Sequence, residues 1–434
     1  MGQRLYIVTS PQDVSAIYRN TTTLTFDEFV RDMMLSFGAS EEGVRKMWES
    51  PRTSGNVGSL HKVLAHAGED YYRQQFHPGD RLDDLWSNIQ DRLSASLQWN
   101  AITGDKSLSA QHGVKTVSLM DLCQDVLLSS ATSAVFGDRL LQLAPNLLRA
   151  FIVFDDESWK LTYKLPPFLA KEMHKARQDI FAALQSYFAL PRDERTGATW
   201  VVDILETEMR RIGLEEHDIA ALFGMPFWVI NGNAYKLCFW YMAYLVNDAE
   251  LLRAVRAEVD PAISQGLLGL EGRLEECPRL VAVYHEVLRC HTASASVRSV
   301  AAPTDLGDVT LDAGAKVLLP YRQLHFDASV FAPHVEEFRA DRFLAQTDLS
   351  KSPSFRPFGG GTTYCAGRHV ARRELLTFAA LMVHRYDIEV APLHSGMAQA
   401  RFPRCDVKKP SLGVLPPLAG DDMILNLRKR CGGV

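Results

Sequence analysis

Residues 358–367 read Phe-Gly-Gly-Gly-Thr-Thr-Tyr-Cys-Ala-Gly, and this decapeptide constrains the fold more than any other stretch of the chain. Its cysteine, Cys365, follows three consecutive glycines, and Gly367 precedes a stretch of helix-forming residues. A metal-binding thiolate needs backbone N–H donors around its sulfur, because a buried bare anion is costly. Glycines let the backbone approach a flat cofactor closely. The decapeptide therefore predicts a loop that holds a thiolate ligand; the alternative is a glycine-rich surface turn with an incidental cysteine.

The composition around this loop is that of a soluble globular protein. The chain has 434 residues, is 47% hydrophobic and 23% charged, and carries a formal net charge of −5. A nucleic-acid-binding protein would carry a large basic excess, so that class is excluded. The 7 cysteines are odd in number and form no Cys-x-x-Cys pair, which argues against a disulfide framework or a structural zinc site and favours a reducing compartment.

Hydrophobic patterning predicts a mainly α chain with small β-sheets and one domain over residues 1–434, since no repeat or linker divides it. Strand-like alternation covers residues 295–316, and a strand pair is expected within residues 410–430. The most apolar stretch, residues 221–246, contains Pro226, Asn231 and other polar groups that are expensive in lipid. It therefore predicts a buried central helix rather than a membrane span.

Two weaker motifs precede the cysteine loop. Glu286 and Arg289 lie three residues apart on a predicted helix, so they share one helical face and can pair. Arg342 follows about fifty residues later and can join them in a buried, mutually neutralising network. Alone, a Glu-x-x-Arg pair is more often a solvated surface pair.

The order and spacing of these motifs resemble the cytochrome P450 family. The Phe-x-x-Gly-x-x-x-Cys-x-Gly spacing of residues 358–367 is that of its haem-thiolate loop. Glu286, Arg289 and Arg342 stand where the family has its Glu-x-x-Arg helix and a later arginine, although Ala340 replaces the usual proline. The resemblance covers nearly the whole chain and implies the mainly α P450 fold, with haem b (iron protoporphyrin IX) as cofactor.

The resemblance also assigns haem contacts. Cys365 is expected to ligate the iron as a thiolate, which favours O–O cleavage at the opposite ligand. Thr363 stands where most members have Arg or His to reach a haem propionate, so Arg298 is the candidate partner. The alternative for Arg298 is an edge-strand arginine that faces water. The other expected haem contacts are Phe358, Gly359, Gly361 and Gly367.

The long helix departs from the usual family pattern. Most members place an acid and an alcohol side by side above the iron to relay protons. Here Gly232 and Asn233 stand in those places, as candidate catalytic residues. This pair resembles the branch of prostacyclin synthase and the sterol 7α- and 12α-hydroxylases, and we expect a fungal biosynthetic member. The alternative is that Gly232 and Asn233 only kink a buried helix.

Substrate contacts follow from the same resemblance. An apolar lining predicts a lipophilic substrate, of terpenoid, sterol or polyketide-like type. The expected contacts are Phe227, Ile230, Asn231, Ala295, Val297, Leu412 and Gly413.

The resemblance implies a monomeric monooxygenase of secondary metabolism that uses dioxygen and electrons from NADPH-cytochrome P450 reductase. Arg368, Arg372 and Arg373, which follow the cysteine, could dock an acidic electron donor or could be solvated surface charge. Because Gly232 and Asn233 replace the relay, a reductase-independent isomerase or dehydratase acting on a peroxide or another oxygenated substrate remains an alternative. A non-catalytic haem sensor is a third hypothesis, which lacks an obvious sixth ligand in the long helix.

Localisation is open on the sequence. Eukaryotic relatives carry an N-terminal membrane anchor before the first strand, and this chain starts almost at that strand. We expect the cytosolic face of the endoplasmic reticulum membrane if an anchor was removed, and the cytoplasm otherwise.

Overall fold

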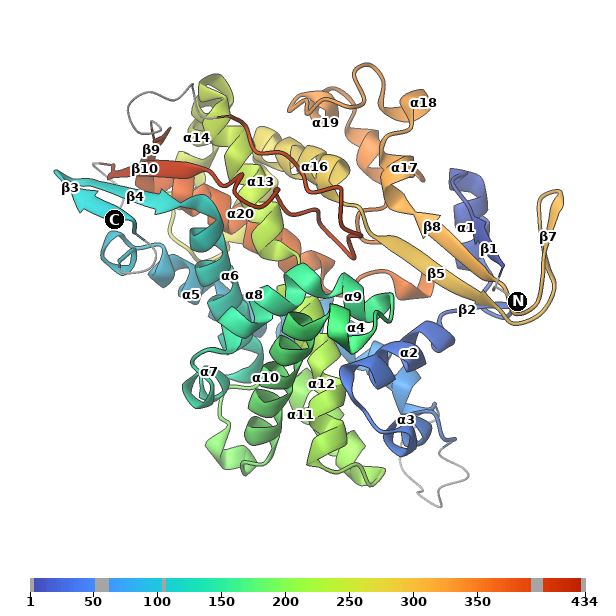
Figure 1. The fold of residues 1–434 in the computed structure, drawn as a ribbon. Helices are drawn as coiled ribbons and strands as arrows, with labels where there is room; N and C mark the ends of the chain where they lie inside the picture. The colour runs from blue at the N-terminus through green and yellow to red at the C-terminus, as the bar shows by residue number, and fades with distance from the viewer. Residues whose placement is uncertain (1–3, 51–61, 104–106, 392–400, 431–434) are drawn as a thin grey trace.

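The computed structural model describes residues 4–50, 62–103, 107–391 and 401–430. Helices form most of it, and two small sheets lie at opposite sides of the helical body (Figure 1). The prediction of a mainly α fold with small sheets is confirmed.

The α-helices follow the expected apolar periodicity, and their ends carry local signals. Ser10 caps the first helix by accepting a hydrogen bond from the Asp13 N–H, with Pro11 in the first helical position. The helices are α1 (Pro11–Arg19), α2 (Asp27–Phe37), α3 (Glu41–Met47), α4 (Leu64–Phe76), α5 (Asp80–Ser96), α6 (Leu119–Phe136), α7 (Arg139–Leu143), α8 (Leu147–Glu157), α9 (Trp159–Thr162), α10 (Lys171–Phe188), α11 (Trp200–Arg211), α12 (Glu216–Asn231), α13 (Ala234–Asn247), α14 (Ala249–Ile263), α15 (Leu270–Glu275), α16 (Pro278–His291), α17 (Tyr321–His325), α18 (Ala328–Phe331), α19 (Arg342–Ala345) and α20 (Arg368–Arg385).

Within the described residues, the strands form two four-stranded sheets and one two-stranded hairpin. The sheet at the N-terminal end has the order β1-β8-β5-β2, and the other has the order β3-β4-β10-β9. Strands β6 and β7 pair with each other. The strands are β1 (Leu5–Ile7), β2 (Leu24–Thr25), β3 (Ser109–Gln111), β4 (Val114–Ser118), β5 (Ala295–Val300), β6 (Thr304–Leu306), β7 (Val309–Leu311), β8 (Lys316–Pro320), β9 (Tyr386–Val390) and β10 (Ile424–Lys429).

The prediction of a strand pair within residues 410–430 was wrong. Within the described part of the tail, the named strand is β10, and it pairs with β9 and β4 from distant parts of the chain. Residues 410–420 instead contain bends, a turn and two isolated bridges, at Val414 and Pro417. Three prolines in this segment lack the N–H that a continuous ladder needs.

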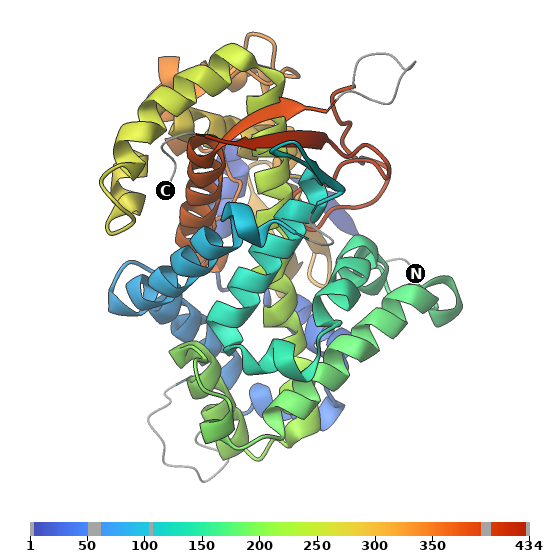
Figure 2. The same ribbon diagram turned by 90° about the vertical axis from the view of Figure 1, so that its left-hand side faces the viewer.

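Helices α12 and α13 run through the centre of the molecule, where Figure 2 shows them as the yellow-green pair. The predicted central helix is broken at Gly232 and Asn233, where the sequence left a kink open. Most of α13 is buried on all sides, with Phe239 and Trp240 at 0% exposure, which explains its nearly uniform hydrophobicity. No helix within the described residues is both long and apolar enough to cross a membrane.

Candidate active site

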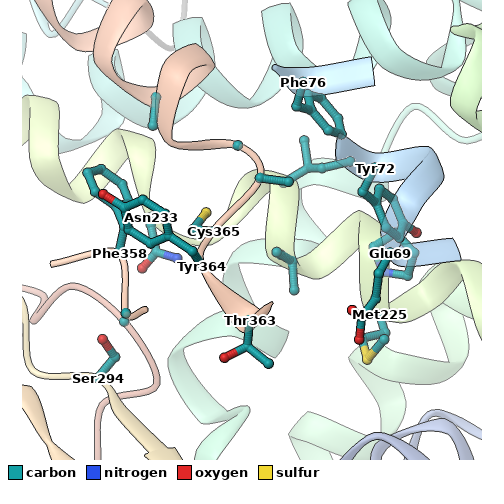
Figure 3. A pocket seen from close by; sticks show the side chains of 18 of the residues that line it. Glu69, Tyr72, Phe76, Met225, Asn233, Ser294, Phe358, Thr363, Tyr364 and Cys365 are labelled. Carbon is teal, nitrogen blue, oxygen red and sulfur yellow. The ribbon is translucent and has the colours of Figure 1, made fainter. Parts of the chain in front are cut away.

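A cavity of about 610 Å³ lies between α12 and the loop that carries Cys365. Side chains from α4, α12, β5 and residues 412–414 complete its wall. Figure 3 shows Glu69, Tyr72 and Met225 on one side of this view, and Cys365, Phe358 and Asn233 on the other. The wall is mostly apolar, with few polar groups, as in sites for small lipophilic molecules.

The Cys365 loop surrounds its sulfur with the predicted N–H donors. The Cys365 N–H donates to the Phe358 carbonyl at 3.1 Å, which closes the loop. Burial raises the pKa of the Cys365 thiol, while hydrogen bonds from the backbone N–H groups of Gly367 and Arg368 act against that rise. These donors are available because α20 begins at Arg368, and the first N–H groups of a helix have no partner within it. The loop can therefore stabilise a thiolate.

The glycines of the loop have two different roles. Gly359 lines the cavity, with a φ of +79° that other residues rarely adopt. Gly361, predicted as a haem contact, does not line the cavity: a Cβ there would lie 2.8 Å from the Tyr18 ring. The reason for glycine at this position is the close packing of Tyr18 from α1, so we do not carry Gly361 forward as a haem contact.

Glu286, Arg289 and Arg342 form the predicted buried network. Arg289 donates to both carboxylate oxygens of Glu286 at 2.8 Å, and Arg342 Nε donates to Glu286 at 3.1 Å. The side chains are 0%, 0% and 5% exposed. The two arginines also donate to main-chain carbonyls between residues 325 and 337, so the network fixes the segment that leads to the cysteine loop.

The break between α12 and α13 places Asn233 in the cavity wall. Its Oδ1 accepts a hydrogen bond from the Val414 N–H at 2.9 Å. A Cβ on Gly413 would collide with the Asn233 side chain, so glycine is required there. Asn233 thus ties the central helix to the turn formed by residues 412–414.

Gly232, predicted to act in catalysis beside Asn233, faces away from this cavity. A Cβ on Gly232 would lie 3.1 Å from the Trp228 carbonyl and 3.2 Å from Asp155 Oδ1. Gly232 lines a second cavity of about 530 Å³. A larger residue would push into Asp155, so packing explains this glycine, and we do not carry a catalytic role for it forward.

A family model of cytochrome P450 matches residues 105–402, more than half of the chain. The chain belongs to the cytochrome P450 family. This P450 is 25% identical to cytochrome P450 monooxygenase poxD of Penicillium oxalicum, over 90% of this chain and 79% of that protein. It is 24% identical to cholesterol 7-alpha-monooxygenase of Cricetulus griseus, over 84% of this chain and 82% of that protein.

The fold of this P450 is similar to that of a solved structure described as retinoic acid bound cyanobacterial CYP120A1. The TM-score is 0.70 at 16% identity, and the match covers 99% of this chain and 90% of that chain. The predicted resemblance to fungal P450s and to the sterol 7α-hydroxylase branch is confirmed, and the chain is an enzyme of the cytochrome P450 family.

The family implies a haem, and Arg298 fits the predicted role of a propionate partner. Arg298 is 4% exposed and donates to Ser296 Oγ and Thr363 Oγ1 at 2.6 Å each. It forms no ion pair with any residue that the structure describes, and burial lowers its pKa. An unpaired buried guanidinium is costly. The residues that it contacts line the cysteine cavity, so an anionic group bound there would relieve this cost.

Five predicted substrate contacts line the cysteine cavity, and two lie elsewhere. Phe227 is fully buried and packs edge-on against Phe151, with ring centroids 5.6 Å apart. Asn231 is 2% exposed and accepts from Thr132 Oγ1 at 3.2 Å. Both point from α12 toward α6 and α8, so we do not carry them forward as substrate contacts. The five that line the cavity are Ile230, Ala295, Val297, Leu412 and Gly413.

We expect Asn233→Leu to destabilise this P450 by about 1–3 kcal/mol, because the buried Val414 N–H would lose its acceptor. Asn233→Asp keeps an acceptor oxygen and should cost less. Urea unfolding of the two variants measures the difference. Equal losses would show that side-chain shape, and not the hydrogen bond, fixes the turn.

Sequence reasoning missed Glu374 on α20, which lines the cysteine cavity. Glu374 is 4% exposed, and its Oε1 has no hydrogen-bond partner among the described residues. Burial raises the pKa of Glu374 to about 8. A carboxylate nine residues after Cys365, directly before the apolar run that starts at Leu375, was the available signal.

This raised pKa predicts a pH dependence of stability. An unfolded glutamate titrates near pKa ~4.3, so between about pH 4.3 and about pH 8 the folded state binds more protons at Glu374 than the unfolded state. The stabilising contribution of the neutral carboxyl is complete below this range and is lost as the pH rises through it, by up to about 1.4 kcal/mol per pH unit. Glu374→Gln should therefore gain stability relative to wild type as the pH rises. Denaturant midpoints of both proteins at pH 5, 6.5 and 8 measure it, and parallel curves would contradict it.

Proposed function

We propose that this P450 holds haem b through Cys365 and oxidises a lipophilic terpenoid, sterol or polyketide-like molecule, using dioxygen and electrons from NADPH-cytochrome P450 reductase. The observation that carries the proposal is a cysteine with N–H donors around its sulfur, at the wall of a mostly apolar cavity. When bound, a thiolate-ligated haem supplies oxygen activation and insertion into the substrate.

The residues of this chain divide the remaining tasks. Cys365 would hold the iron, and Arg298 would neutralise a propionate. Ile230 and Val297 present apolar surface to the cavity, which favours burial of a lipophilic substrate and excludes water. Asn233 would orient the substrate, or a water molecule, through its side-chain amide hydrogens, because the Val414 contact uses only its Oδ1 as an acceptor.

The basic residues that follow Cys365 offer an electron donor little unpaired positive charge. Arg372 pairs with Glu275, and Arg373 pairs with Asp83 at 2.9 Å. Arg368 donates to the Cys365 carbonyl at 2.8 Å. Because these pairs neutralise two of the three arginines, we place any docking of reductase on a mixed surface rather than on a purely basic one.

The first experiment is spectroscopic. The reduced protein under carbon monoxide should show the red-shifted Soret band of a thiolate-ligated haem, and its absence would overturn the proposal. The second follows isotopically labelled dioxygen into product while NADPH consumption is measured with reductase. Turnover of a peroxide substrate without reductase or label would instead identify an isomerase or dehydratase, which the missing acid–alcohol pair at Gly232 and Asn233 keeps as the second candidate.

A further inference from the structure

The second cavity, of about 530 Å³, has no role in the function proposed above. It lies on the other side of the α12–α13 break, against α8, α9, α13 and the turns of residues 410–420. Charged side chains are more numerous in its wall than in the wall of the cysteine cavity, where they are Glu69, Arg73 and Glu374. The charged residues of its wall are Asp155, Asp156, Lys236, Asp406, Lys409 and Asp422.

The two cavities share part of their walls. We call the shared residues the constriction; they are Phe29, Val229, Asn233, Ala295, Leu412, Gly413 and Val414. Val229 is 56% exposed although it sits on a central helix, because its side chain faces both cavities. Every residue of the constriction is uncharged, and Asn233 alone among them has a polar side chain. An apolar chain that crossed this shared wall would therefore desolvate no charge.

The charges of the second cavity leave an acidic excess. Lys236 pairs with Asp155 at 2.6 Å, and Lys409 pairs with Asp156 at 2.7 Å. Asp406 is 8% exposed and, like Asp422, forms no ion pair with the described residues. Burial raises the pKa of Asp422. A ligand that donates hydrogen bonds would be favoured here, and an anionic one would be repelled.

The space available in the cysteine cavity points the same way. Part of its 610 Å³ has to hold the haem that the family implies, so less than that volume remains for a substrate. A long molecule with one end near the iron needs further room, and the second cavity beyond the constriction would supply it.

We propose that the substrate site continues through the constriction into the second cavity, and that this cavity binds the hydroxyl or amine end of a long, otherwise apolar substrate. The proposal rests on the proposed function, because it takes the cysteine cavity as the haem site. It adds that the substrate is amphipathic and that Asp406 and Asp422 accept hydrogen bonds from its polar end.

Alkylimidazoles test the proposal because the imidazole nitrogen binds haem iron and shifts the Soret band. The probes are butylimidazole, which is the short control, dodecylimidazole, imidazolyl-dodecanol and imidazolyl-dodecanoate. Wild type should bind imidazolyl-dodecanol about tenfold more tightly than dodecylimidazole, and imidazolyl-dodecanoate least tightly. If the reduced protein lacks the carbon monoxide spectrum of a thiolate-ligated haem, the proposed function is wrong. If that spectrum is present but the probes bind alike, only the proposed second-cavity site is wrong.

Three variants test the constriction, the wall of the cysteine cavity and the wall of the second cavity separately. Ala295→Phe should weaken the long probes about tenfold and leave butylimidazole within about twofold. Val297→Phe is the matched control on the same strand, since Val297 lines the cysteine cavity alone, and it should affect short and long probes alike. Asp406→Asn should shrink the preference for the hydroxyl over the carboxylate end about tenfold.

Equal effects of Ala295→Phe on the short and long probes, or no effect on either, would overturn the extension through the constriction. Equal affinity of wild type for the methyl, hydroxyl and carboxylate ends would overturn the assignment of a donor-binding subsite.

Discussion

Cys365→Ala is expected to abolish the red-shifted carbon monoxide band and to lower turnover by more than about a hundredfold. Mutation of a residue that only hydrogen-bonds to a metal ligand already lowers metal affinity or activity by up to about a hundredfold, and loss of the ligand itself should cost more. The reason lies in the loop. The N–H groups of Gly367 and Arg368 converge on the Cys365 sulfur, and no second cysteine among the described residues lines the cavity wall. Haem content and the reduced carbon monoxide spectrum measure the effect.

The control is the same substitution at another partly buried cysteine. Cys405 contacts His291 Nδ1 at 3.2 Å and lies outside the cysteine cavity. Cys405→Ala should keep the spectrum. A spectrum retained in Cys365→Ala and lost in Cys405→Ala would assign the iron ligand to Cys405 and refute the assignment made here.

Glu286→Gln is expected to destabilise the folded protein by about 3–5 kcal/mol, because it leaves two buried guanidinium groups without their shared counter-charge. Such a loss is a large part of the roughly 5–15 kcal/mol that holds a typical domain folded. Arg289 and Arg342 would still donate to main-chain carbonyls, but these bear no formal charge. We expect a low yield of soluble protein and poor haem retention.

Lys175→Gln provides the comparison, because Lys175 pairs with Asp179 at 2.8 Å with side chains 77% and 50% exposed. Exposed pairs contribute little, so its urea midpoint should match wild type. If Glu286→Gln also matched wild type, the network would not be the structural pin that we infer. Measuring the haem-free form as well separates loss of folding from loss of cofactor.

The sequence predicted the local parts of the site better than its distant parts. Cys365 and its N–H donors belong to one short loop, so spacing alone indicated them. Glu286, Arg289 and Arg342 followed from the resemblance of their order and spacing to the P450 pattern, and a buried network of one carboxylate and two guanidinium groups is physically consistent with it. These residues interact mainly with near neighbours or with opposite charge.

Predictions on the long helix were less successful because its rotation depends on tertiary packing. Phe227 and Asn231 turn toward α6 and α8, while Val229 and Ile230 face the cysteine cavity. The orientation of α12 about its axis depends on the break at Gly232 and on the neighbouring helices. The sequence does not show which face of a broken helix meets which neighbour. Asn233 lies in the cavity wall, and its hydrogen bond to Val414, which the sequence does not show, joins residues 181 positions apart.

The packing of Tyr18 against Gly361 has a consequence for protein engineering. The Arg298 guanidinium also lies over the Tyr18 ring, with its Cζ 5.2 Å from the ring centroid. The Tyr18 hydroxyl contacts the Tyr321 hydroxyl. A residue near the start of the chain thus supports the cysteine loop more than three hundred positions away. Trimming of the N-terminus for expression should therefore stop before Pro11, and mutant libraries aimed at the redox behaviour of the haem should include position 18.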